Sequence, residues 1–132
     1  MKFLNLILFL LTVSIALAQT MNQFDTDGKR HGHWAKTFNN TKVLRYEGEF
    51  FHGKEIGKFK FYKNVNNKAV LSATRLFNKE NDITDVKFFT SKGKLISEGK
   101  MDGKTYIGTW KYYQKNSDSL LILERYNNSG RL

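Results

Sequence analysis

The 132-residue sequence contains no cysteine and no proline. Without cysteine, the chain can form no disulfide and has no thiolate to act as a nucleophile or as a metal ligand. The lipid anchor of bacterial lipoproteins needs a cysteine after an N-terminal apolar segment, so the composition excludes that anchor too.

The patterns of common catalytic sites are also missing. There is no Gly-x-Ser-x-Gly elbow for a nucleophilic serine, and the glycines are spaced for turns rather than as a phosphate-binding loop. Carboxylates such as Glu47 and Glu49 alternate with apolar residues, which places them on the polar face of a strand beside lysines. A catalytic carboxylate pair needs a pocket that separates the environments of its members. We therefore predict that the protein is not an enzyme.

Candidate metal ligands are scarce. His31 and His33 are two residues apart and would share one face of a strand, but no third ligand is near in the sequence. Closed metal sites need three or four ligands. His52 is expected in a solvated turn. The sequence therefore predicts no metal and no other cofactor.

Concentrated charge is absent as well, although the net charge is +10. The basic residues are spread from Lys29 to Arg131 without a run longer than two. Nucleic-acid-binding domains usually gather positive charge on one face or helix, so no nucleic-acid partner is predicted. A diffuse distribution is typical of a solvated polar face, and it would also attract anionic lipid headgroups or anionic glycans.

The N-terminus has the pattern of a secretory signal peptide. Lys2 precedes an apolar run over 3–11, and Ala16-Leu17-Ala18 provides a small-x-small cleavage site. The alternative, a membrane anchor, fits less well because polar residues interrupt a stretch shorter than the roughly 20 residues of a spanning helix. We predict cleavage after Ala18 and no transmembrane segment in the mature chain.

Removing 18 of the 132 residues would leave one modest domain of 114 residues. Small secreted eukaryotic domains often depend on disulfides. A cysteine-free exported chain is therefore expected to be bacterial and either periplasmic or secreted.

The glycines mark a recurring unit. The segment at 28–34 (GKRHGHW) matches 53–59 (GKEIGKF) and, with one inserted residue, 103–110 (GKTYIGTW). The aromatic residue then opens a short strand at 34–38, 59–62, 86–89 and 110–113. A second strand follows each of these, at 44–50, 71–77, 95–101 and 121–127. A fixed period in the twenties with two elements per unit indicates a repeat array.

The elements are expected to be strands. In 44–50, apolar residues alternate with Arg45, Glu47 and Glu49, a period of two that separates an apolar from a polar face. A glycine inside a strand is simplest to explain if an aromatic ring lies across its backbone, and the other glycines suit turns. The residues assigned these structural roles are Gly28, Gly32, Trp34, Gly48, Gly53, Gly57, Phe59, Gly99, Gly103, Gly108 and Trp110.

The unit resembles the MORN (membrane occupation and recognition nexus) repeat, in a variant found in bacterial exported proteins. The residues that carry the resemblance are 46–50 (YEGEF) with 53–59, and 97–103 (SEGKMDG) through 110–113 (WKYY). The unit at 71–89 departs from the pattern because Arg75 replaces the strand glycine. The resemblance implies an elongated antiparallel sheet that serves as a scaffold or protein-binding surface. Such proteins are often labelled antitoxin-like, a cytoplasmic role that conflicts with the signal peptide.

The predicted organisation is a signal peptide at 1–18, a lead-in at 19–27, a repeat domain at 28–127 and the start of an incomplete repeat at 128–132. The predicted fold is an all-β, elongated antiparallel meander of hairpins in a largely single-layer sheet.

Most aromatic residues are needed for the core of such a sheet. A sharper hypothesis is a binding stripe of alternating aromatic and basic residues, formed by Tyr62, Phe89, Tyr113, Lys60, Lys87 and Lys111. The open edges of the sheet invite strand addition. The first functional prediction is therefore a non-catalytic binding or scaffold module for a protein partner in the cell envelope, or self-association by a sheet edge. The alternative is a peripheral binder of anionic glycan or lipid.

Overall fold

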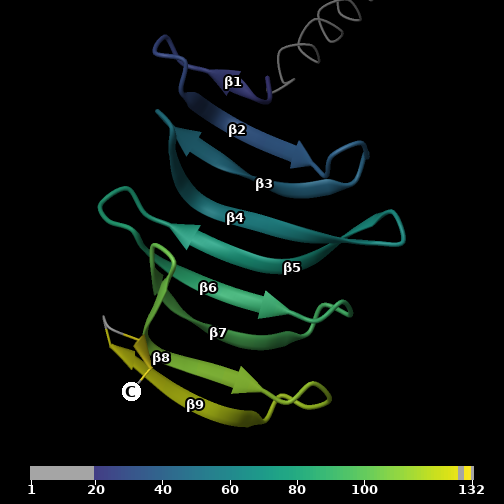
Figure 1. Cartoon of the computed structure of the whole chain (residues 1–132), viewed down its shortest axis with the longest axis vertical. Helices are drawn as coiled ribbons and strands as arrows, with labels where there is room; N and C mark the ends of the chain where they lie inside the picture. The colour runs from purple at the N-terminus through teal and green to yellow at the C-terminus, as the bar shows by residue number, and fades with distance from the viewer. Residues whose placement is uncertain (1–19, 128–129, 132) are drawn as a thin grey trace, which may run out of the picture.

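The computed structural model describes residues 20–127 and 130–131, which form one open antiparallel sheet. Figure 1 shows its strands following one another along the long axis in chain order. The strands are β1 (Gln23–Phe24), β2 (Arg30–Thr37), β3 (Leu44–Phe51), β4 (Lys54–Val65), β5 (Lys68–Phe77), β6 (Ile83–Phe89), β7 (Leu95–Asp102), β8 (Thr105–Tyr113), β9 (Leu120–Asn127) and β10 (Gly130–Arg131). The described residues contain no helix. The predicted all-β hairpin meander is therefore confirmed.

The predicted signal peptide at 1–18 lies outside the described residues, as do positions 128, 129 and 132 of the predicted incomplete repeat. Positions 130–131 form β10, which pairs with Asn127 and Tyr126 of β9. Within the described part of the chain, no helix is long and apolar enough to cross a membrane.

The sheet has two chemically different faces. In antiparallel strands, residues that are paired across the ladder point to the same face. The charged face therefore carries the cross-strand sets Glu47 with Lys60, and Lys87 with Glu98 and Lys111. The aromatic face carries the residues at alternate positions, which include Tyr46, Phe50, Phe59, Val86 and Trp110.

The repeats around Gly48 and Gly99 contain the same irregularity in strand pairing. Glu47 pairs with Lys60 and Glu49 with Ile56, so three residues of β4 lie opposite Gly48 alone. In β7 and β8 the same shift leaves three residues opposite Gly99. Each insertion starts at a glycine, Gly57 or Gly108, whose φ of 66° or 64° disfavours other residues. The extra residues form a β-bulge, which bends the strand and re-aims its side chains.

The bulge brings an aromatic ring onto the strand glycine. A Cβ atom on Gly48 would lie 2.4 Å from the Phe59 ring, and one on Gly99 would lie 2.3 Å from the Trp110 ring. The two rings are almost completely buried, with 2% and 0% of their surface exposed. Neighbouring rings extend each contact: Phe59 meets Phe50 edge-on at 5.2 Å between centroids. These ring-on-glycine contacts are the core of the sheet, which has no second layer within residues 20–127 and 130–131.

The unit formed by β5 and β6 replaces this contact with polar chemistry. Arg75 occupies the glycine position and pairs with Val86, which is buried where the other units have a ring. The Arg75 guanidinium donates from Nε and Nη2 to Thr84 Oγ1, at 3.1 and 2.8 Å. It also donates to the Gly103 carbonyl at 2.7 Å. On the following strand, Arg75 therefore faces a residue smaller than the rings that face Gly48 and Gly99, whereas on β4 it pairs with Phe59.

All four strands that were expected to begin at the aromatic position begin earlier. Those expected at 34–38 and 86–89 begin at Arg30 and Ile83. Those expected at 59–62 and 110–113 begin at Lys54 and Thr105, before the Gly-x-aromatic pattern. That pattern is a bulge inside a long strand, whereas the turns lie earlier, at His52-Gly53 and Gly103-Lys104. The glycine before the ring therefore bends a strand and does not start one.

Candidate functional site

The charged face places five of the six predicted stripe residues in two clusters. Tyr62 and Lys60 lie beside Glu47, whereas Tyr113, Lys87 and Lys111 lie around Glu98. Phe89 is not part of either cluster. It is half-buried at the end of β6, opposite Leu95.

The first cluster is centred on the Glu47 carboxylate. The Tyr62 hydroxyl donates to Glu47 Oε1 at 2.7 Å, and Lys60 Nζ lies 3.4 Å from the same oxygen. His33 Nε2 lies 4.0 Å from Oε2. Three strands, β2, β3 and β4, therefore contribute to one carboxylate.

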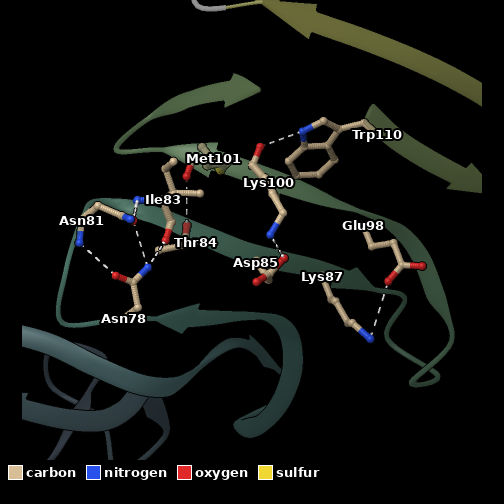
Figure 2. A network of polar contacts seen from close by, with 10 residues as sticks. All are labelled: Asn78, Asn81, Ile83, Thr84, Asp85, Lys87, Glu98, Lys100, Met101 and Trp110. Carbon is tan, nitrogen blue, oxygen red and sulfur yellow. Dashed lines mark hydrogen bonds and ion pairs between the residues drawn. The ribbon is translucent and has the colours of Figure 1, made fainter. Parts of the chain in front are cut away.

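The second cluster repeats the first, since Glu98, Lys111 and Tyr113 each follow their counterparts by 51 residues. The Tyr113 hydroxyl donates to Glu98 Oε1 at 2.7 Å, and Lys87 Nζ lies 3.5 Å from Oε2. Figure 2 shows Lys87 reaching across to Glu98. Beside them, Lys100 reaches Asp85, with Nζ 2.7 Å from Oδ1.

These contacts keep the two carboxylates ionised. The hydrogen bond from Tyr62 is the main reason that the pKa of Glu47 is lowered, and the one from Tyr113 acts in the same way on Glu98. Burial, with the Glu47 contact second, raises the pKa of Tyr62 to about 12. Near neutral pH the Glu47 and Glu98 carboxylates are therefore negatively charged.

A hollow opens beside each cluster, behind the bulge. The first has a volume of about 210 Å³ and is lined by residues that include Glu47, Gly57 and Lys60. The second has a volume of about 490 Å³ and is lined by residues that include Glu98, Gly108 and Lys111. Because the bulge glycines have no side chain, backbone and flanking charges are accessible there. The charged face thus presents two related, shallow polar sites.

Removing the Tyr62 hydroxyl tests the role of its hydrogen bond to Glu47. We expect Tyr62→Phe to lower the free energy of unfolding by about 1–2 kcal/mol at neutral pH, because a hydrogen bond to a charged acceptor is lost. The folded-state pKa of Glu47 is lowered from its ordinary 4.5. The contribution is therefore present above pH 4.5 and is lost as the pH falls through the folded-state pKa. Urea unfolding of both proteins across this range measures it.

Tyr113→Phe provides the repeat-related comparison and should show the same pH dependence. A stability difference between wild type and Tyr62→Phe that stays constant from neutral to acidic pH would contradict the assignment.

A third hollow, of about 520 Å³, lies near the N-terminal end of the sheet and combines rings with cations. Its lining includes Phe24, Trp34 and Tyr46 together with Lys29, Arg30 and Lys36. The Arg30 guanidinium lies 4.2 Å from the Phe50 ring centroid, within cation–π range, and donates to the Tyr46 hydroxyl at 3.3 Å. Aromatic and basic residues therefore surround an open space here, but none of them belongs to the predicted stripe.

The two ends of the sheet differ. At the N-terminal end, Asn22 covers β2: its backbone N–H donates to the His33 carbonyl at 2.9 Å, and its side-chain oxygen accepts from Ala35 N–H at 2.9 Å. At the other end, β10 pairs only with Tyr126 and Asn127. The part of β9 over 120–123 has no strand beside its outer edge among the described residues. Four consecutive apolar side chains there are about half exposed: Leu120, Leu121, Ile122 and Leu123.

The carboxylates of the two clusters are not part of the predicted stripe. The signal that could have placed them is the 51-residue repeat of Glu, Lys and Tyr combined with strand alternation. The two histidines that are close in sequence have different neighbours in the structure. His33 lies beside Glu47, and His31 lies beside Asp25 and His52. Comparison with known protein families, with curated proteins and with solved structures finds no match to this chain.

Proposed function

We propose that this chain is an exported MORN-like repeat protein of a bacterial cell envelope, and that it binds a protein partner by adding a strand at β9. The observation that carries the proposal is the difference between the two ends of the sheet. Asn22 and β1 cover the edge of β2, whereas among the described residues no strand lies beside the outer edge of β9 over 120–123, where the apolar side chains are about half exposed. Soluble proteins usually protect long apolar edges, and an uncovered one suits a partner strand.

Three further observations support this proposal. The apolar segment at 3–11 and the Ala16-Leu17-Ala18 pattern favour export. The ring-on-glycine units fit the MORN resemblance. The charges of Glu47 and Glu98 are fixed by hydrogen bonds and ion pairs, which is suited to a binding surface and not to acid–base catalysis.

The experiment is retention on isolated bacterial envelopes. Purified protein carrying Leu121→Asp and Leu123→Asp should lose retention, because charged side chains at the edge oppose docking of an apolar strand. Leu76→Asp is the matched control, because Leu76 has similar exposure (47%) on the interior strand β5. Retention of the β9 variant at the wild-type level would refute the proposal.

Salt separates this function from a second candidate, a peripheral binder of anionic glycan or lipid. The N-terminal hollow with its three basic and three aromatic residues favours that candidate. An electrostatic binder elutes at moderately raised ionic strength, whereas strand addition resists it. Gel filtration of the purified protein identifies self-association: a dimer that the β9 variant loses would make a second copy the partner.

A further inference from the structure

Two turns near the N-terminal end of the sheet bring together an acidic residue and two histidines. Asp25 lies in the turn between β1 and β2, His31 in β2, and His52 in the turn between β3 and β4. One potential ligand atom from each of the three lies within 4.8 Å of the other two. The hairpins therefore create a set of ligands that is spread over 27 residues of sequence.

The Asp25 carboxylate is held in place before any ligand arrives. Its Oδ1 accepts hydrogen bonds from the backbone N–H groups of Asp27 at 2.9 Å and Lys29 at 2.8 Å. Its side chain is 7% exposed. The other oxygen, Oδ2, lies 2.7 Å from His52 Nδ1. The loop thus fixes one oxygen and directs the other toward the imidazole.

His52 lies in a turn with φ of 46°, in the left-handed region. The other described non-glycine residues with positive φ are all asparagines, which tolerate this region best: Asn22, Asn40, Asn66 and Asn67. The His52 N–H also donates to His31 Nδ1 at 3.3 Å, and the two rings are 4.6 Å apart. A histidine whose ring joins a second histidine and a carboxylate points to a role for the imidazole.

We propose that Asp25, His31 and His52 bind a divalent transition-metal ion, with Zn²⁺ as the reference ion. Two imidazoles and one carboxylate suit zinc, copper, nickel and iron, and three protein ligands leave a position for water. In tetrahedral zinc sites, ligand atoms are roughly 3.3 Å apart. The 2.7 Å contact between His52 and Asp25 must therefore open slightly as the ion replaces the hydrogen between them. At His52 the proton leaves Nδ1 for solvent and Nε2 takes one up, so a neutral imidazole binds without net proton release. At His31 the hydrogen bond from the His52 N–H to Nδ1 must break, because the Nδ1 lone pair then goes to the ion or, if Nε2 binds, to a proton.

Nearby cations limit the affinity. Lys79 Nζ lies 4.9 Å from the Phe51 ring centroid, and that ring packs against both histidines. The Lys29 side chain also lies close to the turn that holds His52. A Cβ atom added to Gly53, the next residue, would lie 3.4 Å from the Cβ atom of Lys29. Their repulsion of a dication makes micromolar binding the expectation, strong enough to link the two turns at the N-terminal end of the sheet.

Calorimetric titration of the purified protein with ZnCl₂ tests the site. One ion should bind per chain, and His31→Asn and His52→Asn should each weaken binding by about tenfold or more. Asparagine is chosen because it tolerates the backbone of residue 52. His33→Asn is the matched control and should bind as wild type does, because His33 lies beside Glu47.

A measurement on the wild type makes the test independent of variant folding. Zinc should shift the NMR signals of the His31 and His52 imidazoles and leave those of His33 unchanged, and it should raise the melting temperature. No saturable binding, or equal loss of binding in His33→Asn, would overturn the proposal. So would equal shifts of all three imidazoles.

Discussion

Gly99→Ala should lower the free energy of unfolding by about 3 kcal/mol, at the upper end of the cost of overpacking a core. The added Cβ would lie 2.3 Å from Trp110 Cδ2. The indole cannot easily move away, because it is fully buried, stacks on Tyr106 at 4.3 Å, and donates to the Lys100 carbonyl at 2.9 Å. Denaturant unfolding followed by tryptophan fluorescence measures the loss, which is a large share of the stability of a small domain.

Gly108→Ala separates the steric clash from backbone strain. Gly108 has φ of 64° and nothing within 4 Å of its Cβ direction, so only the left-handed backbone cost of about 1–2 kcal/mol applies. If Gly99→Ala were no more destabilising than Gly108→Ala, the ring-on-glycine contact would not be the source of the stability.

The chain itself suggests a compensating substitution. Where Arg75 replaces the strand glycine, the opposing residue on the following strand is Val86 and not a ring. In Gly99→Ala with Trp110→Val, the added methyl group therefore meets a smaller side chain. We expect the double variant to be more stable than the sum of the single effects predicts, by about 1–3 kcal/mol. Strict additivity would argue against the contact.

The fold could be predicted because two periods of the sequence recur in the structure: the two-residue alternation along a strand and the repeat of the glycine-marked unit. Alternation in 44–50 fixes the faces of β3, and the repeated glycines mark successive units. Gly48 and Gly99 stand out because an unexplained strand glycine calls for a close neighbour, and the ring follows after a constant interval of 11 residues. These are local signals, and a meander consists of local pairings.

The charged clusters are harder to predict because they depend on register. The sequence predicts Tyr62 on an exposed stripe, yet it is half-buried and its hydroxyl is bonded to Glu47. A register shift between Phe61 and Tyr62 precedes this side chain, and nothing in the alternation of residues reveals that shift. The binding role of the stripe stays a prediction, now tied to two carboxylates.

The histidine cluster depends on turn geometry in a similar way. Sequence spacing pairs His31 with His33 because the two are neighbours on one strand. In the structure the partners of His31 are His52 and Asp25, which belong to two turns. Two hairpins must have the observed lengths before these turns meet. Sequence spacing within one strand carries no information about that meeting.

Arg75→Met should lower the free energy of unfolding by about 3 kcal/mol, because the guanidinium donates to two acceptors at once. These are the buried Thr84 hydroxyl and the Gly103 backbone carbonyl. Thr84 is 1% exposed and would lose both donors to its hydroxyl oxygen. The hydroxyl keeps only its long donation to the Met101 carbonyl, at 3.5 Å. Loss of the donors to a buried polar group costs about 1–3 kcal/mol, and the bond to the Gly103 carbonyl is lost in addition. Methionine keeps the apolar stem, so the effect isolates the charged group. Arg45→Met, at an exposed position of β3, is the matched control and should change stability by less than about 0.5 kcal/mol.

A second substitution separates the lost hydrogen bonds from lost packing. Thr84→Val removes the hydroxyl that Arg75 serves and keeps the shape of the side chain. When both partners of a buried polar contact become apolar, the cost can nearly vanish. We therefore expect Arg75→Met with Thr84→Val to recover about 1–2 kcal/mol relative to Arg75→Met alone. The bond to the Gly103 carbonyl stays lost, so recovery should be incomplete. If Thr84→Val destabilised Arg75→Met further, the hydrogen bonds to the buried hydroxyl would not explain the contribution of Arg75. That contribution would then lie in the packing of Arg75 against Phe77. The polar unit would act only as a spacer between two aromatic cores.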